Sequence, residues 1–242
     1  MNTLILTQSS PPTPAFLTHI QKLGFNTLHA PVLSVTYNTN PLKLDFIPRT
    51  LVVTSKHALN NIASLALKKD IQVLCVGETL SSTLMNKGFT NILSVFETGA
   101  DLIKSIQDNS DQYRDVLFLR GKDVQHDLKS VCKTLDISFQ EHVQYHTSFI
   151  DSFSEDVRLS IISEQYLTVG VFSNRGAQAL TNIIEIQNLK DKMMRTNLLC
   201  LSDRMVKSLD HFKWKNCYTC PSANQQSFID QLDKIKRTDM TS

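Results

Sequence analysis

Glycine is scarce in this chain, which has only seven glycines among 242 residues. The sequence contains neither G-x-G-x-x-G nor G-x-x-x-x-G-K-[ST], the glycine-rich loops that bind dinucleotides and nucleoside triphosphates. It also lacks G-x-S-x-G, the motif that presents a nucleophilic serine in many hydrolases. A dinucleotide fingerprint, a P-loop and a serine-hydrolase motif are therefore all unsupported.

An excess of one charge is also lacking, because 25 basic residues are balanced by 23 acidic ones and the net charge is +2. Binding of nucleic acid depends on a concentrated basic face, so this balance predicts no nucleic-acid partner. No apolar run approaches the roughly 18 residues of a membrane span. The N-terminus lacks the basic segment of a signal peptide. We expect a cytoplasmic protein without a membrane partner.

The five cysteines are an odd number and widely spread, which fits reduced thiols better than a disulfide framework. Cys217 and Cys220 form a C-x-x-C, but no second cysteine pair completes a zinc site, so we interpret them as structural thiols. His142 and His146 are expected on a strand, where four residues span about 13 Å, too far for one ion. The sequence predicts no metal site.

What the chain does contain is a duplicated pattern in a shuffled order. The duplicated segments are residues 74–84 (L-C-V-G-E-x5-L) and 199–209 (L-C-L-S-D-x5-L), residues 53–58 (V-T-S-K-H-A) and 172–177 (F-S-N-R-G-A), and, more faintly, residues 4–28 and 116–140. We name the three kinds of segment T, V and R after Thr54, Val76 and Arg120. The chain then reads R, T-V-R, T-V, which indicates two similar domains.

Each segment has the same shape, a short apolar run followed by a turn and a helical period. In segment T, residues 50–53 form the apolar run, Thr54 and Ser55 can cap a helix, and that helix would bury Ala58 and Leu65. In segment R, Gly121 is expected to form the turn. Apolar strands that alternate with helices indicate parallel sheets covered on both faces, so we predict an α/β fold.

The order of the segments predicts how the chain is divided. Residues 45–143 hold T, V and R and can close as one domain. Residues 1–34 and 148–242 hold R and then T and V, and must come together as a discontinuous domain. The chain therefore crosses between the domains twice, at 35–44 and 143–147, and β-forming residues at both places predict two adjacent strands. We expect a cleft between the domains.

Polar and basic residues follow the predicted strands. Parallel sheets bind ligands outside the carboxyl ends of their strands, and helix N-termini there favour carboxylate or phosphate. Helix capping alone is the alternative for any one of these residues. The candidate ligand-binding residues are Thr54, Ser55, Lys56, Gly77, Glu78, Thr79, Arg120, Gly121, Ser173, Asn174, Arg175, Ser202, Asp203 and Arg204.

At these residues the chain resembles the uroporphyrinogen-III synthase family. The resemblance covers nearly the whole chain and is carried by P-V-L-S-V (31–35), L-V-V-T-S-K-H-A (51–58), C-V-G-E-T-L-S-S-T-L (75–84), L-F-L-R-G (117–121), V-Q-Y-H-T (143–147) and F-S-N-R-G (172–176). The family usually has threonine where this chain has Leu80 and Met205, and often arginine where it has Gln8. These departures put a role for those three side chains in doubt.

The resemblance implies two flavodoxin-like domains joined by a two-stranded β crossing, with no metal and no organic cofactor. It implies the substrate hydroxymethylbilane, a linear tetrapyrrole rich in carboxylates, which is closed with inversion of ring D and loss of water to uroporphyrinogen III. Such a reaction is mainly a positioning task. Tyr145 matches the family's crossing tyrosine and is the expected catalytic proton donor, with packing of the crossing as the alternative. We expect a monomer.

Two other functions remain open. A non-catalytic, two-lobed clamp for an anionic small molecule would use the same crossings and helix ends, and Leu80 and Met205 favour it slightly. A flavodoxin-like regulatory pair would need a phospho-acceptor aspartate at a strand end, and the sequence offers no convincing one. Turnover, as opposed to binding alone, would discriminate the synthase from the clamp.

Overall fold

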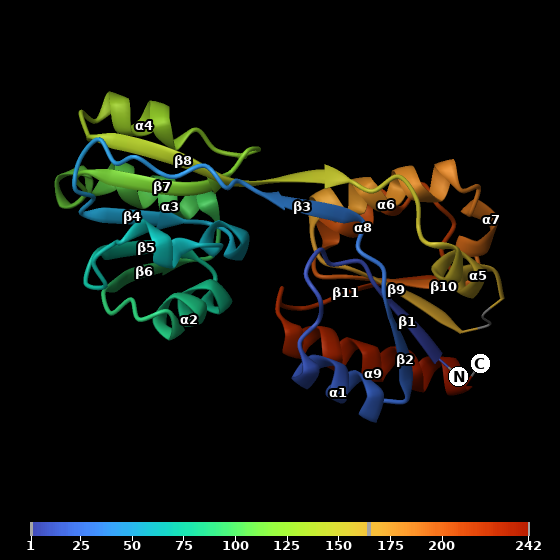
Figure 1. Ribbon diagram of the computed structural model, residues 1–242. Helices are drawn as coiled ribbons and strands as arrows, with labels where there is room; N and C mark the ends of the chain where they lie inside the picture. Colours follow the sequence, from blue (N-terminus) through green and yellow to red (C-terminus); the bar gives the residue numbers. More distant parts are fainter. Residues whose placement is uncertain (1, 164–165, 242) are drawn as a thin grey trace. The chain divides into compact units, whose positions relative to one another are not determined.

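The structure is a computed structural model that describes residues 2–163 and 166–241 (Figure 1). The chain divides into two compact units: unit 1 consists of residues 1–34 and 148–242, and unit 2 consists of residues 35–147. Four hydrophobic clusters form the core, two of them within unit 1 and two within unit 2. In the described chain, no helix is long and apolar enough to span a membrane.

Unit 1 contains a parallel five-stranded sheet in the order β11-β10-β9-β1-β2. Its strands are β1 (Asn2–Leu6), β2 (Phe25–His29), β9 (Leu167–Val171), β10 (Thr196–Cys200) and β11 (Asn216–Thr219). Its helices are α1 (Pro14–Lys22), α5 (Glu155–Ser163), α6 (Asn174–Ile186), α7 (Lys190–Met193), α8 (Asp203–Leu209) and α9 (Gln225–Thr241).

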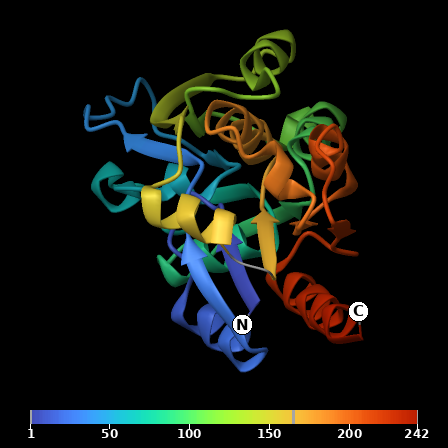
Figure 2. The same cartoon turned by 90° about the vertical axis from the view of Figure 1, so that its right-hand side faces the viewer.

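Helices cover both faces of this sheet (Figure 1 and, turned by 90°, Figure 2). On one face, Phe16 and Ile20 of α1 and Phe228 and Leu232 of α9 form a single cluster with β1. Residues of α5, α6, α7 and α8 form the cluster on the other face. Because no face is left to water, every residue of β9 and β10 is buried, as expected for central parallel strands.

Unit 2 contains a six-stranded sheet in the order β3-β8-β7-β4-β5-β6. Its strands are β3 (Leu33–Tyr37), β4 (Thr50–Val53), β5 (Gln72–Val76), β6 (Ile92–Phe96), β7 (Val116–Gly121) and β8 (Phe139–Phe149). Its helices are α2 (Glu78–Asn86), α3 (Gly99–Asp108) and α4 (Leu128–Thr134), with the 3-10 turns η1 (Lys56–Leu59), η2 (Ile62–Leu65) and η3 (Ser110–Gln112). One face packs against α2, η1 and η2, and the other against α3 and α4.

The chain passes between the units inside β3 and β8, which are neighbours in the sheet. β8 pairs in parallel with β7 from Val116↔Phe139 onward, and the register shifts by one residue between Arg120 and Gly121. Such a bulge redirects the side chains that follow it. As a result, Tyr145 lies directly opposite Gly121.

The repeated segments form equivalent strands in the two sheets. Segments V, T and R give β11-β10-β9-β1-β2 in one unit and β6-β5-β4-β7-β8 in the other, which is the same order. In unit 2 the order, counted along the chain from β4 to β8, is 3-2-1-4-5, a doubly wound arrangement that differs from the 2-1-3-4-5 of flavodoxin itself. In unit 1 the same arrangement counts as 5-4-3-1-2, because segment R comes first in the chain. The pairing Leu4↔Thr27 also recurs as Val116↔Phe139 at one constant offset. The predicted α/β class with two parallel sheets is confirmed.

Segment T differs from the prediction in its first copy. The helix expected after Thr54 and Ser55 is replaced by the short turns η1 and η2. Asn61 has a φ of 57° and Ala66 a φ of 49°, so the backbone twice enters the left-handed region, which no helix can pass through. Asparagine tolerates this conformation better than most residues, and it is the residue at which the two turns separate.

The alignment of the two T segments was also wrong by one residue. Ser55 caps η1 and Ser173 caps α6, so these two serines are equivalent. The sheet agrees, since Thr50 pairs with Val116 and Thr168 with Leu4. The predicted match of Thr54 with Ser173 followed the similarity of small polar residues, which cannot resolve a shift of a single position.

Candidate functional site

A pocket of about 300 Å³ lies in unit 2 at the carboxyl edge of the sheet. It opens at the ends of β4 and β7, where the strand order reverses, because the chain runs from β4 toward β6 on one side and from β7 toward β8 on the other. This switch point is where open α/β sheets bind ligands. The pocket is lined by Val52, Thr54, Ser55, Val76, Gly99, Leu102, Ile103, Phe118, Gly121, Asp123, Val124, Gln125, His126, Leu128 and Tyr145.

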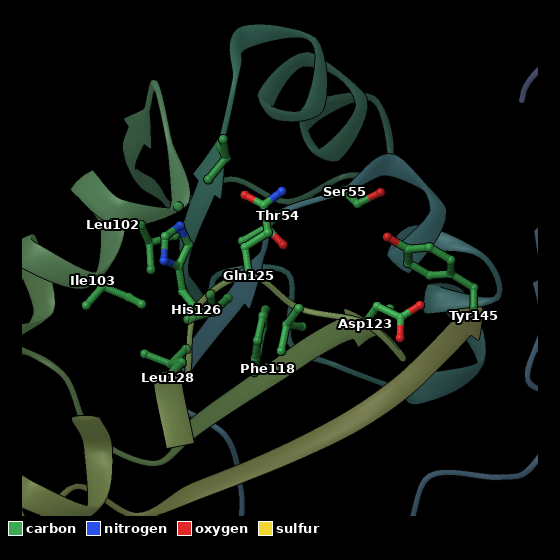
Figure 3. A pocket seen from close by; sticks show the side chains of 15 residues that line it. Thr54, Ser55, Leu102, Ile103, Phe118, Asp123, Gln125, His126, Leu128 and Tyr145 are labelled. Atoms are coloured by element: carbon green, nitrogen blue, oxygen red, sulfur yellow. The ribbon is translucent and has the colours of Figure 1, made fainter. Parts of the chain in front are cut away.

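The pocket lining combines buried apolar side chains with exposed polar ones, which Figure 3 labels. Leu102, Phe118 and Leu128 are buried and belong to the cluster between the sheet and α3 and α4. Tyr145 and His126 lie toward opposite ends of the pocket, and the phenol oxygen of Tyr145 points to the side on which Ser55 lies (Figure 3). A flat apolar ring with polar substituents fits this distribution of side chains.

Gly121 makes room for the ring of Tyr145. A Cβ atom on Gly121 would lie 2.8 Å from Cζ and 3.0 Å from the hydroxyl oxygen of Tyr145, closer than carbon contacts allow. Gly121 lies inside β7 and does not have a positive φ, so the prediction that it forms a turn is wrong. The physical requirement is close approach of a neighbouring side chain, which the glycine permits because it has no Cβ.

Thr54, Ser55 and Lys56 follow β4 in direct succession, and the first two line the pocket. The Ser55 hydroxyl accepts a hydrogen bond from the His57 backbone N–H at 3.3 Å and so caps η1. Partial burial lowers the pKa of the Lys56 ammonium. Burial, and then the charge of Lys56, lower the pKa of His57, so its imidazole is neutral at pH 7.

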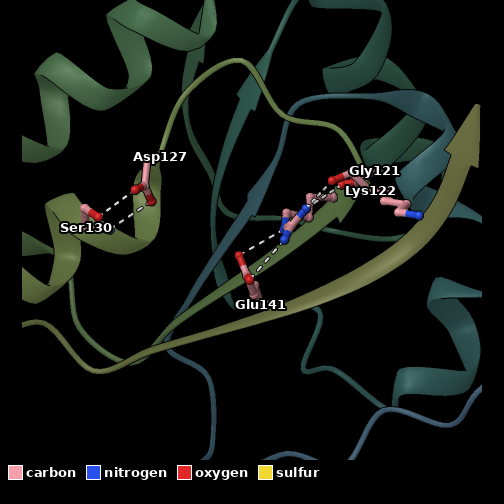
Figure 4. Close-up of polar contacts among 6 residues, drawn as sticks. Gly121, Lys122, Asp127, Ser130 and Glu141 are labelled. Atoms are coloured by element: carbon pink, nitrogen blue, oxygen red, sulfur yellow. Dashed lines mark hydrogen bonds and ion pairs between the residues drawn. The ribbon is translucent and has the colours of Figure 1, made fainter.

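Arg120 forms hydrogen bonds to three residues of unit 2, Glu141, Gly121 and Lys122, which are labelled in Figure 4. Its Nε and Nη2 atoms donate to the two carboxylate oxygens of Glu141 at 2.9 and 3.0 Å. Its Nη1 atom donates to the carbonyl oxygens of Gly121 and Lys122, both at 2.8 Å. The side chain is only 15% exposed. In this arrangement Arg120 holds the loop that begins at Gly121.

The other end of this loop is fixed as well. Asp127 caps α4, because its Oδ1 accepts from the Ser130 N–H at 3.0 Å and its Oδ2 from the Ser130 hydroxyl at 2.6 Å (Figure 4). These hydrogen bonds from Ser130 lower the pKa of the Asp127 carboxyl. The loop of residues 121–127, which carries Gln125 and His126 into the pocket lining, is therefore tied down at both ends.

Gly77, Glu78 and Thr79 lie at the same sheet edge but outside the pocket lining. Gly77 has a φ of 86° and precedes the first turn of α2, where Glu78 and Thr79 are exposed. Leu80 points into the core on the other side of the sheet. Among these residues, only the backbone and the two exposed side chains can meet a ligand.

The remaining predicted residues lie at the carboxyl edge of the sheet in unit 1. Ser173 caps α6 by accepting the Gly176 N–H at 2.9 Å. The Oδ1 atom of Asn174 is buried and has no hydrogen-bond partner among the described residues. The guanidinium of Arg175 lies 5.6 Å from the ring centre of Phe149. Ser202 precedes α8 as its N-cap residue, and Asp203 and Arg204 are exposed on the first turn.

The sequence interpretation missed part of the pocket. The missed polar residues are Asp123, Gln125 and His126, and the missed apolar ones include Leu102 and Phe118. The R-G motif located the start of the loop, but nothing in the sequence indicated that residues beyond it would turn back toward the end of β4. Leu102 of α3 could be interpreted from the sequence only as a buried residue of a helix, and not as part of a pocket.

The cysteines are all free, and Cys217 is exposed whereas Cys200 and Cys220 are buried. Burial raises the pKa of the Cys220 thiol to about 11 and raises that of Cys200 further, so neither is a thiolate at neutral pH. Within residues 2–163 and 166–241, no group of three histidine, cysteine or carboxylate side chains could hold a metal ion.

The fold and the site together define a class of protein: an α/β protein with two parallel sheets that presents hydroxyl, amide and basic groups at the carboxyl edges, beside a small pocket with a tyrosine at one end. The model of the uroporphyrinogen-III synthase HemD family matches residues 15–230, which is most of the chain. The chain belongs to the uroporphyrinogen-III synthase family.

Solved structures with the same fold include uroporphyrinogen-III synthetase from Helicobacter pylori, which is 15% identical, with 97% of this chain and 100% of that chain covered and a TM-score of 0.65. A variant of uroporphyrinogen III synthase from Thermus thermophilus is 12% identical and has a TM-score of 0.57. That comparison covers 98% of this chain and 100% of the Thermus chain. Comparison with curated proteins finds no match. At these identities the structural likeness concerns the fold.

Proposed function

We propose that this protein is a uroporphyrinogen-III synthase, a cofactor-independent lyase that closes hydroxymethylbilane to uroporphyrinogen III in tetrapyrrole and heme biosynthesis. The observation that carries the proposal is the family match over residues 15–230. The pocket at the switch point, with Tyr145 at one end, supports it because it offers a place for the reacting part of the substrate. The small-molecule substrate is acidic, and polar or basic groups surround the carboxyl edges of both sheets.

The chemistry begins with loss of the terminal hydroxyl group of the substrate. The pyrrole nitrogen supplies the electron pair that breaks the C–O bond, and Tyr145 gives a proton so that the group leaves as water. The substituted α-carbon of ring D, which already carries the methylene bridge to ring C, attacks the resulting azafulvenium cation. The bond between this carbon and its old methylene bridge then breaks, which leaves a second azafulvenium cation on ring C, and the free α-carbon of ring D attacks that cation and closes the macrocycle with ring D inverted. The proton lost from this free α-carbon balances the proton given by Tyr145, so the net change is loss of one water.

We assign one pyrrole ring of the substrate to the pocket in unit 2. The apolar side chains of Leu102, Phe118 and Leu128 suit the faces of the ring. The hydroxyl groups of Thr54 and Ser55 can donate hydrogen bonds to its carboxylates. A pocket of about 300 Å³ is at the small end of ligand sites, which suits a single ring and not the whole tetrapyrrole.

Further substrate carboxylates are assigned to the other predicted residues. In unit 2 these are Lys56 and the loop of Gly77, Glu78 and Thr79, where backbone N–H groups face outward at the start of α2. In unit 1 they are the loops of Ser173, Asn174 and Arg175 and of Ser202, Asp203 and Arg204. Arg120 and Gly121 contribute by fixing the loop and the tyrosine. Leu80 and Met205 are buried and stabilise the core instead.

The test is an assay of the product isomers. The purified protein is incubated with hydroxymethylbilane, and the products are oxidised and separated into isomers I and III. We expect isomer III to predominate, because uncatalysed closure gives the uninverted isomer I. Formation of isomer I alone would refute the synthase. Tight binding of the substrate without turnover would instead select the non-catalytic clamp.

We further propose that the enzyme works in the cytoplasm as a monomer. The five free thiols support a reducing compartment, where cysteines stay unpaired. Size-exclusion chromatography with light scattering across a range of protein concentrations measures the oligomeric state. A mass twice that of the 27.4 kDa chain would contradict the proposal.

A further inference from the structure

Three aromatic side chains from different elements form a row beside the pocket. Tyr37 comes from β3, His57 from η1 and Tyr145 from β8. The Tyr37 hydroxyl lies 3.0 Å from Nδ1 of His57, within hydrogen-bond distance. The imidazole in turn lies 5.4 Å from the centre of the Tyr145 ring, tilted by 48°. All three residues belong to unit 2, so this row is internal to one compact body.

The Tyr145 ring is therefore in contact with two fixed groups. One is the backbone of Gly121 at the end of β7, which leaves no space between the strand and the ring. The other is the imidazole of His57, whose own backbone N–H is held by Ser55 at 3.3 Å. A side chain held in this way has little freedom of rotation, and its hydroxyl group stays directed into the pocket.

The same kind of contact occurs in unit 1. Ser55 and Ser173 are equivalent caps, so the residue two positions after each cap is also equivalent, His57 in one unit and Arg175 in the other. Arg175 lies over the ring of Phe149, which is another residue of β8. In both repeats, this position supports an aromatic side chain of the same strand. The contact belongs to segment T. The predicted site included Arg175 but not the equivalent residue His57.

We propose that His57, held by Tyr37, is a positioning residue that fixes the ring of Tyr145 at the end of the pocket. The proposal rests on the proposed function, because it assigns Tyr145 its role as proton donor. A proton donor must stay within hydrogen-bond reach of the leaving oxygen, and displacement by about 1 Å can cost up to 100-fold in rate. His57 acts through Tyr145 and is not assigned a contact with the substrate.

The neutral state of His57 is consistent with this role. Its pKa is lowered by burial and by Lys56, so at neutral pH it carries no charge. A neutral Nδ1 can accept a hydrogen bond from the Tyr37 hydroxyl, which fixes the plane of the imidazole. The imidazole then presents an uncharged face to Tyr145.

The test compares rates of isomer III formation among folded variants. We expect His57→Ala to lower kcat roughly tenfold while KM changes less than about twofold, because positioning affects the reacting step and not the binding of the remaining rings. His57→Phe keeps an aromatic ring beside Tyr145 and should recover most of the rate. Tyr37→Phe removes a single oxygen and should lower kcat less, in the same direction. His142→Ala is the control, since His142 is a half-buried histidine of β8 outside the pocket lining.

A double-mutant cycle decides whether His57 acts through Tyr145. In a Tyr145→Phe background, His57→Ala should have little further effect on kcat, because the hydroxyl that it positions is already gone. An equal loss in both backgrounds, or an unchanged kcat in both His57→Ala and Tyr37→Phe, would overturn the proposal. If His57→Ala fails to fold, Tyr37→Phe, measured with Tyr145 and with Tyr145→Phe, carries the same comparison. Absence of isomer III with the parent protein would refute the synthase function itself.

Discussion

At the scale of single residues, Gly121 and Tyr145 depend on each other. Gly121 has no Cβ, and this leaves the space that the ring of Tyr145 occupies. The motif L-F-L-R-G drew attention to Gly121, but a turn was the wrong reason for it. The contact depends on a bulge between β7 and β8, which places Tyr145 opposite Gly121. A sequence read along the chain cannot give the register of two strands, so the partner of this glycine could not be predicted.

Gly121→Ala should displace the ring of Tyr145, because the added Cβ would lie 2.8 Å from Cζ. We expect kcat for isomer III to fall by roughly tenfold or more and stability to fall by about 1–3 kcal/mol. Gly170→Ala is a matched control, since its Cβ would lie 2.8 Å from Cζ of Phe228 in the core of unit 1. That variant should lose stability but keep its turnover per folded molecule. Equal turnover in both variants would contradict the role of Gly121.

Tyr145→Phe should lower kcat by about 100-fold, as expected when a general acid is removed, and leave the fold intact. The measurement is the rate of isomer III formation at saturating substrate, together with the thermal unfolding midpoint. Tyr113→Phe is a suitable control, because that hydroxyl lies 3.3 Å from the Ser105 hydroxyl and outside the pocket lining. Unchanged turnover in Tyr145→Phe would show that the phenol hydroxyl is not needed.

At the scale of elements, the loop of residues 121–127 owes its shape to two side chains at its ends, Arg120 and Asp127. The sequence indicated Arg120 as a free ligand-binding cation. Its partner Glu141 lies on β8 and becomes a neighbour only when β7 and β8 pair, so the ion pair was not predictable from local sequence. Asp127 before a helix, by contrast, is a recognisable cap.

Glu141→Gln should loosen this loop. The Arg120 guanidinium would lose its carboxylate partner at a site where it is only 15% exposed, and we expect a loss of about 1–3 kcal/mol in stability. KM for the substrate should rise, because the loop lines the pocket. Asp115→Asn is the control, since it breaks an ion pair whose arginine, Arg49, is 73% exposed, and such pairs contribute about 0–1 kcal/mol. Comparable losses in both variants would contradict the loop-anchoring role of Arg120.

The helical elements show where periodicity is a sufficient guide. The helical period of segment V corresponds to α2, and Gly88, with a φ of 89°, follows the end of that helix. Segment T failed in its first copy, where the spacing of Ala58 and Leu65 suggested one helix. The backbone conformation of Asn61 divides that stretch into two turns, and a hydrophobic spacing contains no information on such a break.

At the scale of the whole molecule, the order R, T-V-R, T-V was enough to predict two similar parallel sheets, because each segment supplies defined strands. The identical strand order in the two units is the structural counterpart of that sequence pattern. The apolar strands and the helical faces predicted the layers as well. Composition and spacing could not predict the local geometry at the sheet edge, where Tyr37 and His57 lie beside Tyr145 and His126 lies toward the opposite end of the pocket.

Because each unit has its own core clusters, a core substitution should destabilise one unit selectively. Leu198 of β10 is fully buried in unit 1, and Leu198→Ala should lower stability by about 2–5 kcal/mol. Amide hydrogen exchange, resolved by residue, should show lost protection in β1, β9 and β10 while β4 and β7 keep theirs. Val73→Ala, at the repeat-equivalent position in unit 2, should give the opposite pattern. Loss of protection in all strands alike would contradict independent cores.

The position of β1 between β9 and β2 in its sheet has a consequence for synthesis on the ribosome. β1 is made before β9, with which it pairs, and the residues of β9 follow it by more than a hundred positions. The core strands β4, β5, β6 and β7 of unit 2, by contrast, are made in one uninterrupted stretch. Unit 2 can therefore fold while the chain is still growing, whereas β1, β2 and α1 must wait with apolar side chains unburied. During that interval the nascent chain exposes apolar side chains, so it is then most prone to aggregate and to bind chaperones.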